Sequence, residues 1–225
     1  MVKIDRLVRS RRKTVAIIVE HSGDLVVRAP LRTSKAQIEE FVAHKAKWIA
    51  RKQAQARKQK DQWKPHHYED GEPFYYLGKT CPLTLVERRR PPLALDLTGK
   101  FTLDRSRQTE GEQIFTAWYR EQARILLAER VEEYAGRGEL GKPVGLRITG
   151  ARTRWGSCGG KGRINFTWRL VMTPLAMIDY VVVHELAHLK ELNHSKAFWA
   201  LVKGVLPDYK SRDRWLKENG HLFIL

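Results

Sequence analysis

Cysteine is scarce in this chain of 225 residues, which contains only Cys81 and Cys158. Two cysteines so far apart exclude a disulfide framework of the kind that stabilises small secreted domains, and they are too few for a four-cysteine zinc site. So little cysteine fits a reducing compartment, and we expect the protein in the cytoplasm. Hydrophobic residues make up 42% of the chain, which is enough to form a substantial core.

Long apolar runs are missing as well. No stretch approaches the roughly 18 consecutive apolar residues that a membrane-spanning helix requires. The first residues, "MVKIDRLVRSRRK", carry a charge every few positions and lack the apolar segment of a secretory signal peptide. We therefore expect neither a membrane partner nor an export signal.

Acidic residues are few relative to basic ones: 25 Asp and Glu stand against 42 Lys and Arg, for a formal net charge of +17. The excess lies mainly in residues 1–108, which hold 24 basic and 12 acidic side chains, against 18 and 13 in residues 109–225. Such a surface suits weak contact with nucleic acid or another polyanion, although a solvated basic surface that aids solubility would have the same composition.

The pattern of apolar residues predicts two regions with a boundary near residue 108. Residues 1–108 form a basic, β-rich N-terminal region, with strands at 14–20 and 25–29 and one long helix near 34–63 that begins with a capping box of Ser34 and Gln37. Residues 109–225 begin with a long amphipathic helix that ends at Gly136. Strands at 145–151 and 163–170 and a helix at 178–192 follow, so we predict an α+β fold.

The segment "HELAHLKELNH", residues 184–194, concentrates polar side chains in an apolar, helical stretch. On a helix, His184 and His188 lie about 40° apart on one face and one turn apart, so two imidazoles can share one zinc ion. Glu185 points about 60° from His188, where it can contact a metal-bound water but is poorly placed as a ligand. This spacing is typical of a general base beside a metal. The alternative is a pair of core histidines bonded to backbone carbonyls.

A third ligand requires a change of direction in the chain. On an unbroken helix, His194 would lie about 120° from His188, so we expect the helix to end near residues 192–193, with Asn193 as the hinge. Ser195 then begins the next helix as its N-cap. His194 is the favoured third ligand; the alternatives are His221, Asp208, Asp213, Glu218 and the pair His66–His67.

Two longer segments, "TRWGSCGGKGRINFTWRLVMTP" and "IDYVVVHELAHLKELNHSKAFW", resemble the C-terminal signature of the YgjP-like metallopeptidase family, formerly catalogued as a domain of unknown function. "RRKTVAIIV", "VRAP", "KWI" and "YLGK" resemble the N-terminal region of that family, so the likeness covers nearly the whole chain. It implies a zincin-like catalytic domain in which the HExxH helix packs on a small mixed sheet. It also implies one zinc ion per chain on His184, His188 and His194, with Glu185 catalytic.

Two other families share parts of this pattern. The ligand spacing matches the metzincins, but Glu191 stands where those proteins have a turn glycine, so we do not place the chain among them. A distant similarity to the Wss1/Spartan class of DNA–protein crosslink proteases rests on the short motif alone.

The expected activity is zinc-dependent hydrolysis of a peptide or protein substrate, with Glu185 as the general base. One alternative is a metal-dependent phosphohydrolase that acts on nucleoside triphosphates. Another is a protease that acts on proteins bound to nucleic acid. We expect the strand at 163–170 to form the sheet edge that receives a peptide, with Trp155, Asn165 and Trp168 lining the cleft; the two tryptophans are also candidates for the core.

Overall fold

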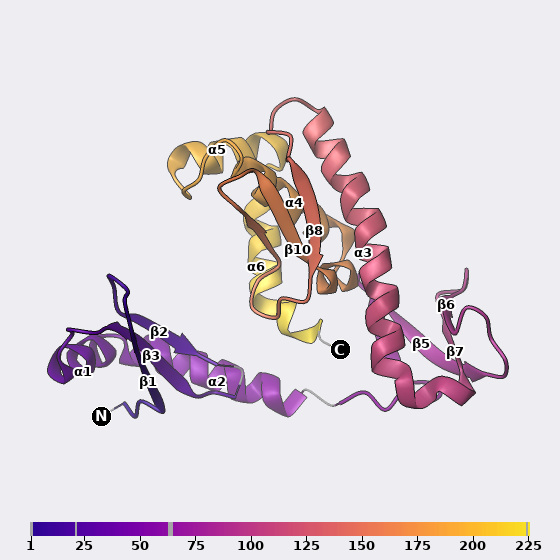
Figure 1. Ribbon diagram of the computed structural model, residues 1–225, viewed down its shortest axis with the longest axis horizontal. Helices are drawn as coiled ribbons and strands as arrows, with labels where there is room; N and C mark the ends of the chain where they lie inside the picture. Colours follow the sequence, from indigo (N-terminus) through magenta and orange to yellow (C-terminus); the bar gives the residue numbers. More distant parts are fainter. Residues whose placement is uncertain (1, 21, 63–64, 224) are drawn as a thin grey trace. The chain divides into compact units, whose positions relative to one another are not determined.

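The computed structural model describes residues 2–20, 22–62, 65–223 and 225 (Figure 1). The chain divides into two compact units, Met1–Pro65 and His66–Leu225. Within the described residues, no helix has both the length and the apolar character needed to cross a membrane.

The first unit is a three-stranded sheet with two helices. Its strands are β1 (Arg6–Ser10), β2 (Ala16–Val19) and β3 (Leu25–Pro30), in the order β1-β3-β2. The central strand β3 is parallel to β1 and antiparallel to β2. Both strands predicted from the sequence are confirmed as β2 and β3. The prediction missed β1, whose residues are mostly exposed and so leave no apolar pattern.

The predicted long helix is two helices, α1 (Lys35–His44) and α2 (Ala46–Gln62). The capping box at the start of α1 is confirmed, since Ser34 Oγ accepts from the Gln37 N–H and the Gln37 side chain accepts from the Ser34 N–H. The break falls at Lys45, where the backbone leaves the helical region and the N–H bonds to Val42 O at 3.1 Å. No proline or glycine marks this position, so the break could not be predicted from the residue types. The core of the unit joins the sheet to both helices through Leu25, Val27, Ala29, Ile38, Val42 and Ile49.

The second unit begins with a four-stranded sheet. Its strands are β4 (Pro73–Tyr76), β5 (Lys79–Val86), β6 (Leu93–Leu95) and β7 (Phe101–Asp104), in the order β4-β5-β7-β6. The 3-10 helix η1 (Arg105–Glu110) leads into α3 (Gly111–Gly136), which confirms the predicted long helix. Phe115 of α3 stacks on Phe74 of β4, with ring centroids 4.1 Å apart, so the sheet and the helix share one core.

A smaller mixed sheet follows, formed by β8 (Gly145–Thr149), β9 (Gly156–Cys158) and β10 (Arg163–Thr167) in the order β8-β10-β9. β10 is parallel to β8 and antiparallel to β9. The 3-10 helix η2 (Trp168–Met172) replaces the end of the strand predicted at 163–170. The remaining elements are α4 (Leu175–Ala187), α5 (Lys196–Val205), α6 (Tyr209–Asn219) and η3 (Gly220–Leu222). α3 runs beside β8 (Figure 1), and α4 packs against β9. The predicted α+β class, with the HExxH helix on a small mixed sheet, is confirmed.

The division between the units differs from the boundary predicted near residue 108. The compact unit that contains α4 starts at His66, because the β4–β7 sheet belongs to the same hydrophobic core as α3 and α4. The prediction followed a change in composition at residue 108. Composition does not report which apolar faces pack together.

Candidate metal centre

α4 carries the HExxH motif in the interior of the second unit. Its residues are apolar on most sides, and Ile178, Val182, Val183 and Leu186 are fully buried. Pro174 stands at its N-cap, where the missing N–H of proline costs little. The sequence therefore fixes a buried helix that presents His184 and His188 one turn apart.

The helix ends earlier than predicted. α4 stops at Ala187 with His188 as its C-cap, rather than near residues 192–193. Two tight turns follow, in which the Leu189 N–H bonds to Leu186 O at 3.0 Å and the Lys190 N–H bonds to Ala187 O at 3.1 Å. Asn193 is not among the described residues with positive φ, so the predicted left-handed hinge is wrong. The reversal is instead spread over the residues after His188, and it needs no single left-handed position.

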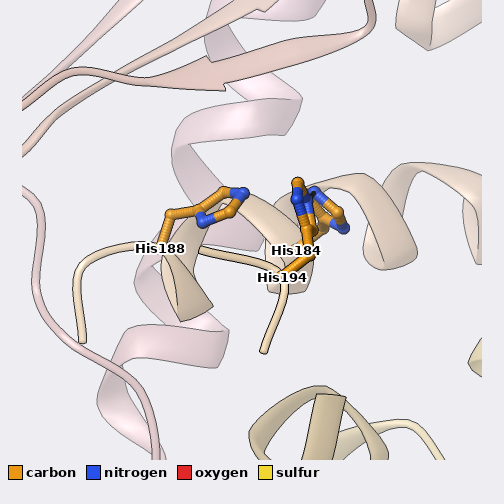
Figure 2. A group of neighbouring side chains, drawn as sticks. All are labelled: His184, His188 and His194. Carbon is orange, nitrogen blue, oxygen red and sulfur yellow. Dashed lines mark hydrogen bonds between the residues drawn. The ribbon is translucent and has the colours of Figure 1, made fainter. Parts of the chain in front are cut away.

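His194 reaches the other two histidines across this turn. A ring nitrogen from each of His184, His188 and His194 lies within 4.8 Å of those of the other two. The Nε2 atoms of His184 and His194 are 3.0 Å apart. Figure 2 shows the ring of His188 pointing toward the other two rings. Ser195 Oγ accepts from the Phe198 N–H at 3.2 Å, which confirms the predicted N-cap that starts α5 next to His194.

The protonation and hydrogen bonding of these rings suit a metal ion. Burial, followed by the neighbouring His188 and His194, lowers the pKa of His184 to about 4, so its imidazole is neutral at neutral pH. Burial and His188 also lower the pKa of His194. His188 Nδ1 lies 3.0 Å from Glu191 O, and because a carbonyl oxygen only accepts, Nδ1 is the donor and this bond orients the ring. Neutral imidazoles with one nitrogen oriented by a carbonyl are the usual metal-binding form.

Glu185 is a buried carboxylate beside this cluster. It is 6% exposed, and its Oε2 has no hydrogen-bond partner among the described residues. Burial raises its pKa to about 7, against smaller opposing effects from Arg154 and from the Cys158 N–H that bonds to the carboxylate. A carboxylate with a pKa near neutrality can both accept and donate a proton at physiological pH.

Gly156 of β9 makes room for Glu185. A Cβ added at Gly156 would lie 2.6 Å from Glu185 Oε1 and 2.7 Å from its Cγ. Any side chain at this position would therefore displace the buried carboxylate. The sequence analysis did not identify Gly156, because its role depends on the packing of β9 against α4.

A pocket of about 280 Å³ opens beside His184 and Glu185. Trp155 lines it, and its role in binding a substrate stays a prediction. Tyr180, Asp213 and Lys217 were not predicted to do so, although Tyr180 lies one turn before His184 and so shares its face of α4. The Tyr180 hydroxyl donates to Asp213 Oδ1 at 3.2 Å. The complete lining is Trp155, Gly156, Tyr180, Val181, His184, Glu185, Asp213, Leu216 and Lys217.

Asn165 and Trp168 do not line this pocket. Asn165 Nδ2 bonds to Ser157 Oγ at 3.3 Å, within the sheet. Trp168 is 3% exposed and stacks on Tyr119 with ring centroids 5.8 Å apart, so it is a core residue. The prediction that their strand is an edge is wrong, because β10 is the central strand of its sheet and β9 is the edge strand next to α4.

Among the described residues, none of the other predicted third ligands belongs to the group of three histidines, although Asp213 lines the pocket beside His184. Asp213 bonds to Tyr180, Asp208 pairs with Arg212, and His66 Nδ1 pairs with Glu72 at 2.7 Å. In the part of the chain that the structure describes, the group of three or more potential ligands is His184, His188 and His194.

The comparison with known protein families agrees with this site. The YgjP-like metallopeptidase domain matches residues 13–219, which is most of both units. This chain belongs to the YgjP-like metallopeptidase family. The resemblance noted in the sequence is therefore confirmed, and the family is one of metal-dependent peptidases.

Two individual proteins are also similar to this YgjP-like chain. The UTP pyrophosphatase of Escherichia coli (strain K12) is 36% identical over 70 residues, which are 31% of this chain and 42% of that protein. The metallopeptidase zymogen abylysin of Pyrococcus abyssi, a solved structure, is 26% identical over 41% of this chain and 93% of that chain, with a TM-score of 0.37. The match therefore spans less than half the length of the curated relative.

Proposed function

We propose that this protein is a zinc-dependent peptidase in which His184, His188 and His194 hold one zinc ion and Glu185 is the general base. The observation that carries the proposal is the convergence of three ring nitrogens within 4.8 Å beside a buried carboxylate oxygen that has no partner among the described residues. Three neutral imidazoles are a common ligand set for catalytic zinc. When bound, zinc supplies a Lewis acid that makes water more acidic and polarises a carbonyl group.

The role of Glu185 follows from its surroundings. Its carboxylate takes a proton from the attacking water and passes it to the leaving amine. A pKa of about 7 suits both steps, since a much stronger acid would hold the proton too weakly and a much weaker one would not release it. Burial that excludes water from the carboxylate is the main cause of this pKa.

The short strand β9 offers a place for the substrate backbone. β9 is an edge strand and pairs with β10 on one side only. An extended peptide can add to such an edge by main-chain hydrogen bonds, which would bring its carbonyl groups close to Glu185. Apolar residues of the adjoining pocket, Trp155, Val181 and Leu216, would receive one of its side chains.

The test combines metal analysis with the variant Glu185→Gln. The protein, purified without an affinity tag, is expected to contain about one zinc ion per chain. Glu185→Gln should keep the metal and lose activity on unfolded casein and on a peptide library by about 10²–10⁴-fold. Glu218→Gln, which alters an exposed carboxylate on α6, is the matched control and should keep both metal and activity.

A second candidate function is tested in the same experiment. This candidate is hydrolysis of a nucleoside triphosphate at the same site; the likeness to a UTP pyrophosphatase covers 31% of this chain and supports it less than the family match supports the peptidase. If wild type hydrolyses UTP, Glu185→Gln abolishes this activity and peptides are not cleaved by either protein, the site is a phosphohydrolase and the peptidase proposal fails. Protein without any transition metal would contradict both candidates.

A further inference from the structure

Arg169 is a buried cation outside the metal centre. It lies in η2, is 7% exposed, and its Nη1 donates to Gly150 O at 3.1 Å. The guanidinium carbon lies 4.1 Å from the centre of the Trp168 ring. Its Nε is buried and has no hydrogen-bond partner among the described residues. A buried charged group with an unpaired donor is costly unless a ligand or counterion completes its surroundings.

Two further arginines come close to Arg169 from other segments. Arg120 of α3 places its Nη2 3.3 Å from the point where a Cβ on Gly150 would stand. Arg152 lies two residues after Gly150, on the loop that follows β8. Both side chains are exposed, so the group opens to solvent on one side while Arg169 forms its buried end.

The charges of these arginines are not balanced by the nearby acid. Burial, then Arg152 and then Arg120 lower the pKa of Arg169 to about 10, and the opposing effect of Glu112 is smaller than any of these. Like charges that gather without a matching carboxylate repel one another. An anion between them would relieve this repulsion.

The loop that contains Gly150 and Arg152 is held in place. Thr167 Oγ1 donates to Ala151 O at 2.8 Å, and Arg169 holds the neighbouring Gly150 carbonyl. A Cβ at Gly150 would lie 3.3 Å from Arg120 Nη2 and 3.8 Å from Trp168 Nε1, so the glycine lets these two donors come close to the loop backbone. The backbone that carries Arg152 is therefore held in position without a ligand, which lowers the cost of ordering this segment on binding.

We propose that Arg120, Arg152 and Arg169 form a binding site for a phosphate group. Guanidinium groups bind phosphate through paired N–H donors, and three of them match a tetrahedral anion with several acceptor oxygens. The phosphate belongs either to free inorganic phosphate or to a larger ligand such as a nucleotide. This site shares no residue with the three histidines or with the pocket beside them, and the proposal does not depend on the reaction catalysed there.

The test is calorimetric titration of inorganic phosphate into the full chain, first with its metal and then after chelation. Binding should persist after chelation; binding that disappears would place phosphate on the metal and overturn the proposal. Arg120→Ala and Arg152→Ala, which alter exposed side chains and spare the core, should each raise the Kd for phosphate at least about tenfold, as expected for loss of a hydrogen bond to a charged group. An unchanged Kd in both variants, or no binding to wild type, would also overturn it.

Arg137→Ala is the matched control, because it removes the same charge 17 residues further along the chain, just past the end of α3, roughly 25 Å away at 1.5 Å per residue. An equal loss in this variant would mean non-specific charge attraction and would contradict a defined site. Acetate that binds as tightly as phosphate would contradict phosphate recognition. Titration with UTP distinguishes free phosphate from the phosphate of a nucleotide. If UTP binds more tightly than phosphate and both Arg120→Ala and Arg152→Ala weaken its binding, the ligand is a nucleotide. If UTP and phosphate bind with equal Kd, the ligand is free phosphate.

Discussion

The two compact units of this protein differ in charge balance and in the size of their cores. Residues 1–65 hold 17 Lys and Arg against 6 Asp and Glu, whereas residues 66–225 hold 25 against 19. Among the described residues, the core of the first unit contains six buried hydrophobic side chains and that of the second contains 33. The small unit therefore carries most of the excess charge, and the large unit has the burial needed to shift the pKa of a site residue.

The differences in core size and charge suit the two units to different functions: acid–base chemistry in the second unit and attraction of polyanions by the first. Deep burial around α4 raises the pKa of Glu185 and lowers that of His184, which a surface position would not do. The basic side chains of the first unit suit attraction of a polyanion such as nucleic acid. We therefore expect changes in one unit to leave the property of the other unchanged.

The largest expected effect is on metal binding by the second unit. His194→Ala should weaken zinc binding by more than about a hundredfold, because losing a ligand costs more than the 10–100-fold typical of an outer-shell partner. His221→Ala, which changes a histidine of η3, should leave the affinity unchanged. Competition with a chelator measures both. If His221→Ala weakens zinc binding and His194→Ala does not, the third ligand is His221 and not His194.

The next effect is on the stability of the metal-free chain. The pKa of Glu185 is higher in the folded state, about 7, than its ordinary value of 4.5, so its ionisation destabilises the folded state as the pH rises from about 4.5 to 7. Glu185→Gln removes this cost. Its free energy of unfolding should therefore equal that of wild type near pH 4 and exceed it by about 3 kcal/mol at pH 8. Because the pKa of His184 is lowered, its contribution has the opposite slope in both proteins, so only their difference is informative.

A third prediction concerns the contact of β9 with Glu185. Gly156→Ala should displace the carboxylate and lower kcat/KM by about 10²-fold, the usual cost of a misplaced catalytic group, with zinc retained. Gly160→Ala is the control, because a Cβ at Gly160 meets nothing within 4 Å. Equal activity of Gly156→Ala and wild type on the same peptide would show that Glu185 tolerates the shift.

The smallest expected effect is on binding of polyanions by the first unit. The full chain should be retained on heparin at about 50 mM salt and be released as salt rises, since release of counterions drives such binding. The fragment of residues 66–225, which has its own core, should bind zinc as the full chain does and elute earlier. Equal retention of the full chain and the fragment would show that the first unit is not the source of polyanion binding.

Much of the local structure could be predicted from the sequence. The capping box at Ser34, the long helix ending at Gly136 and the helix that presents His184 and His188 depend on neighbours three or four residues apart. His184 and His188 were predicted for the same reason, whereas the position of His194 depends on the turn after α4. The exact end of α4 was not predicted, because His188 and the residues after it form tight turns that no glycine or proline marks.

The sequence by itself determined the secondary structure around the HExxH motif, the chemistry of its side chains and the excess of positive charge, because these depend on residue type and short-range spacing. Only the tertiary structure decided that β9 is the edge strand beside α4, that Trp168 is buried, that Gly156 packs against Glu185 and that Arg120 and Arg152 lie near enough to Arg169 to affect its pKa. Each of these depends on which elements pack together across long separations in the chain. Residue spacing does not encode such contacts, since burial of apolar surface drives them without regard to sequence distance.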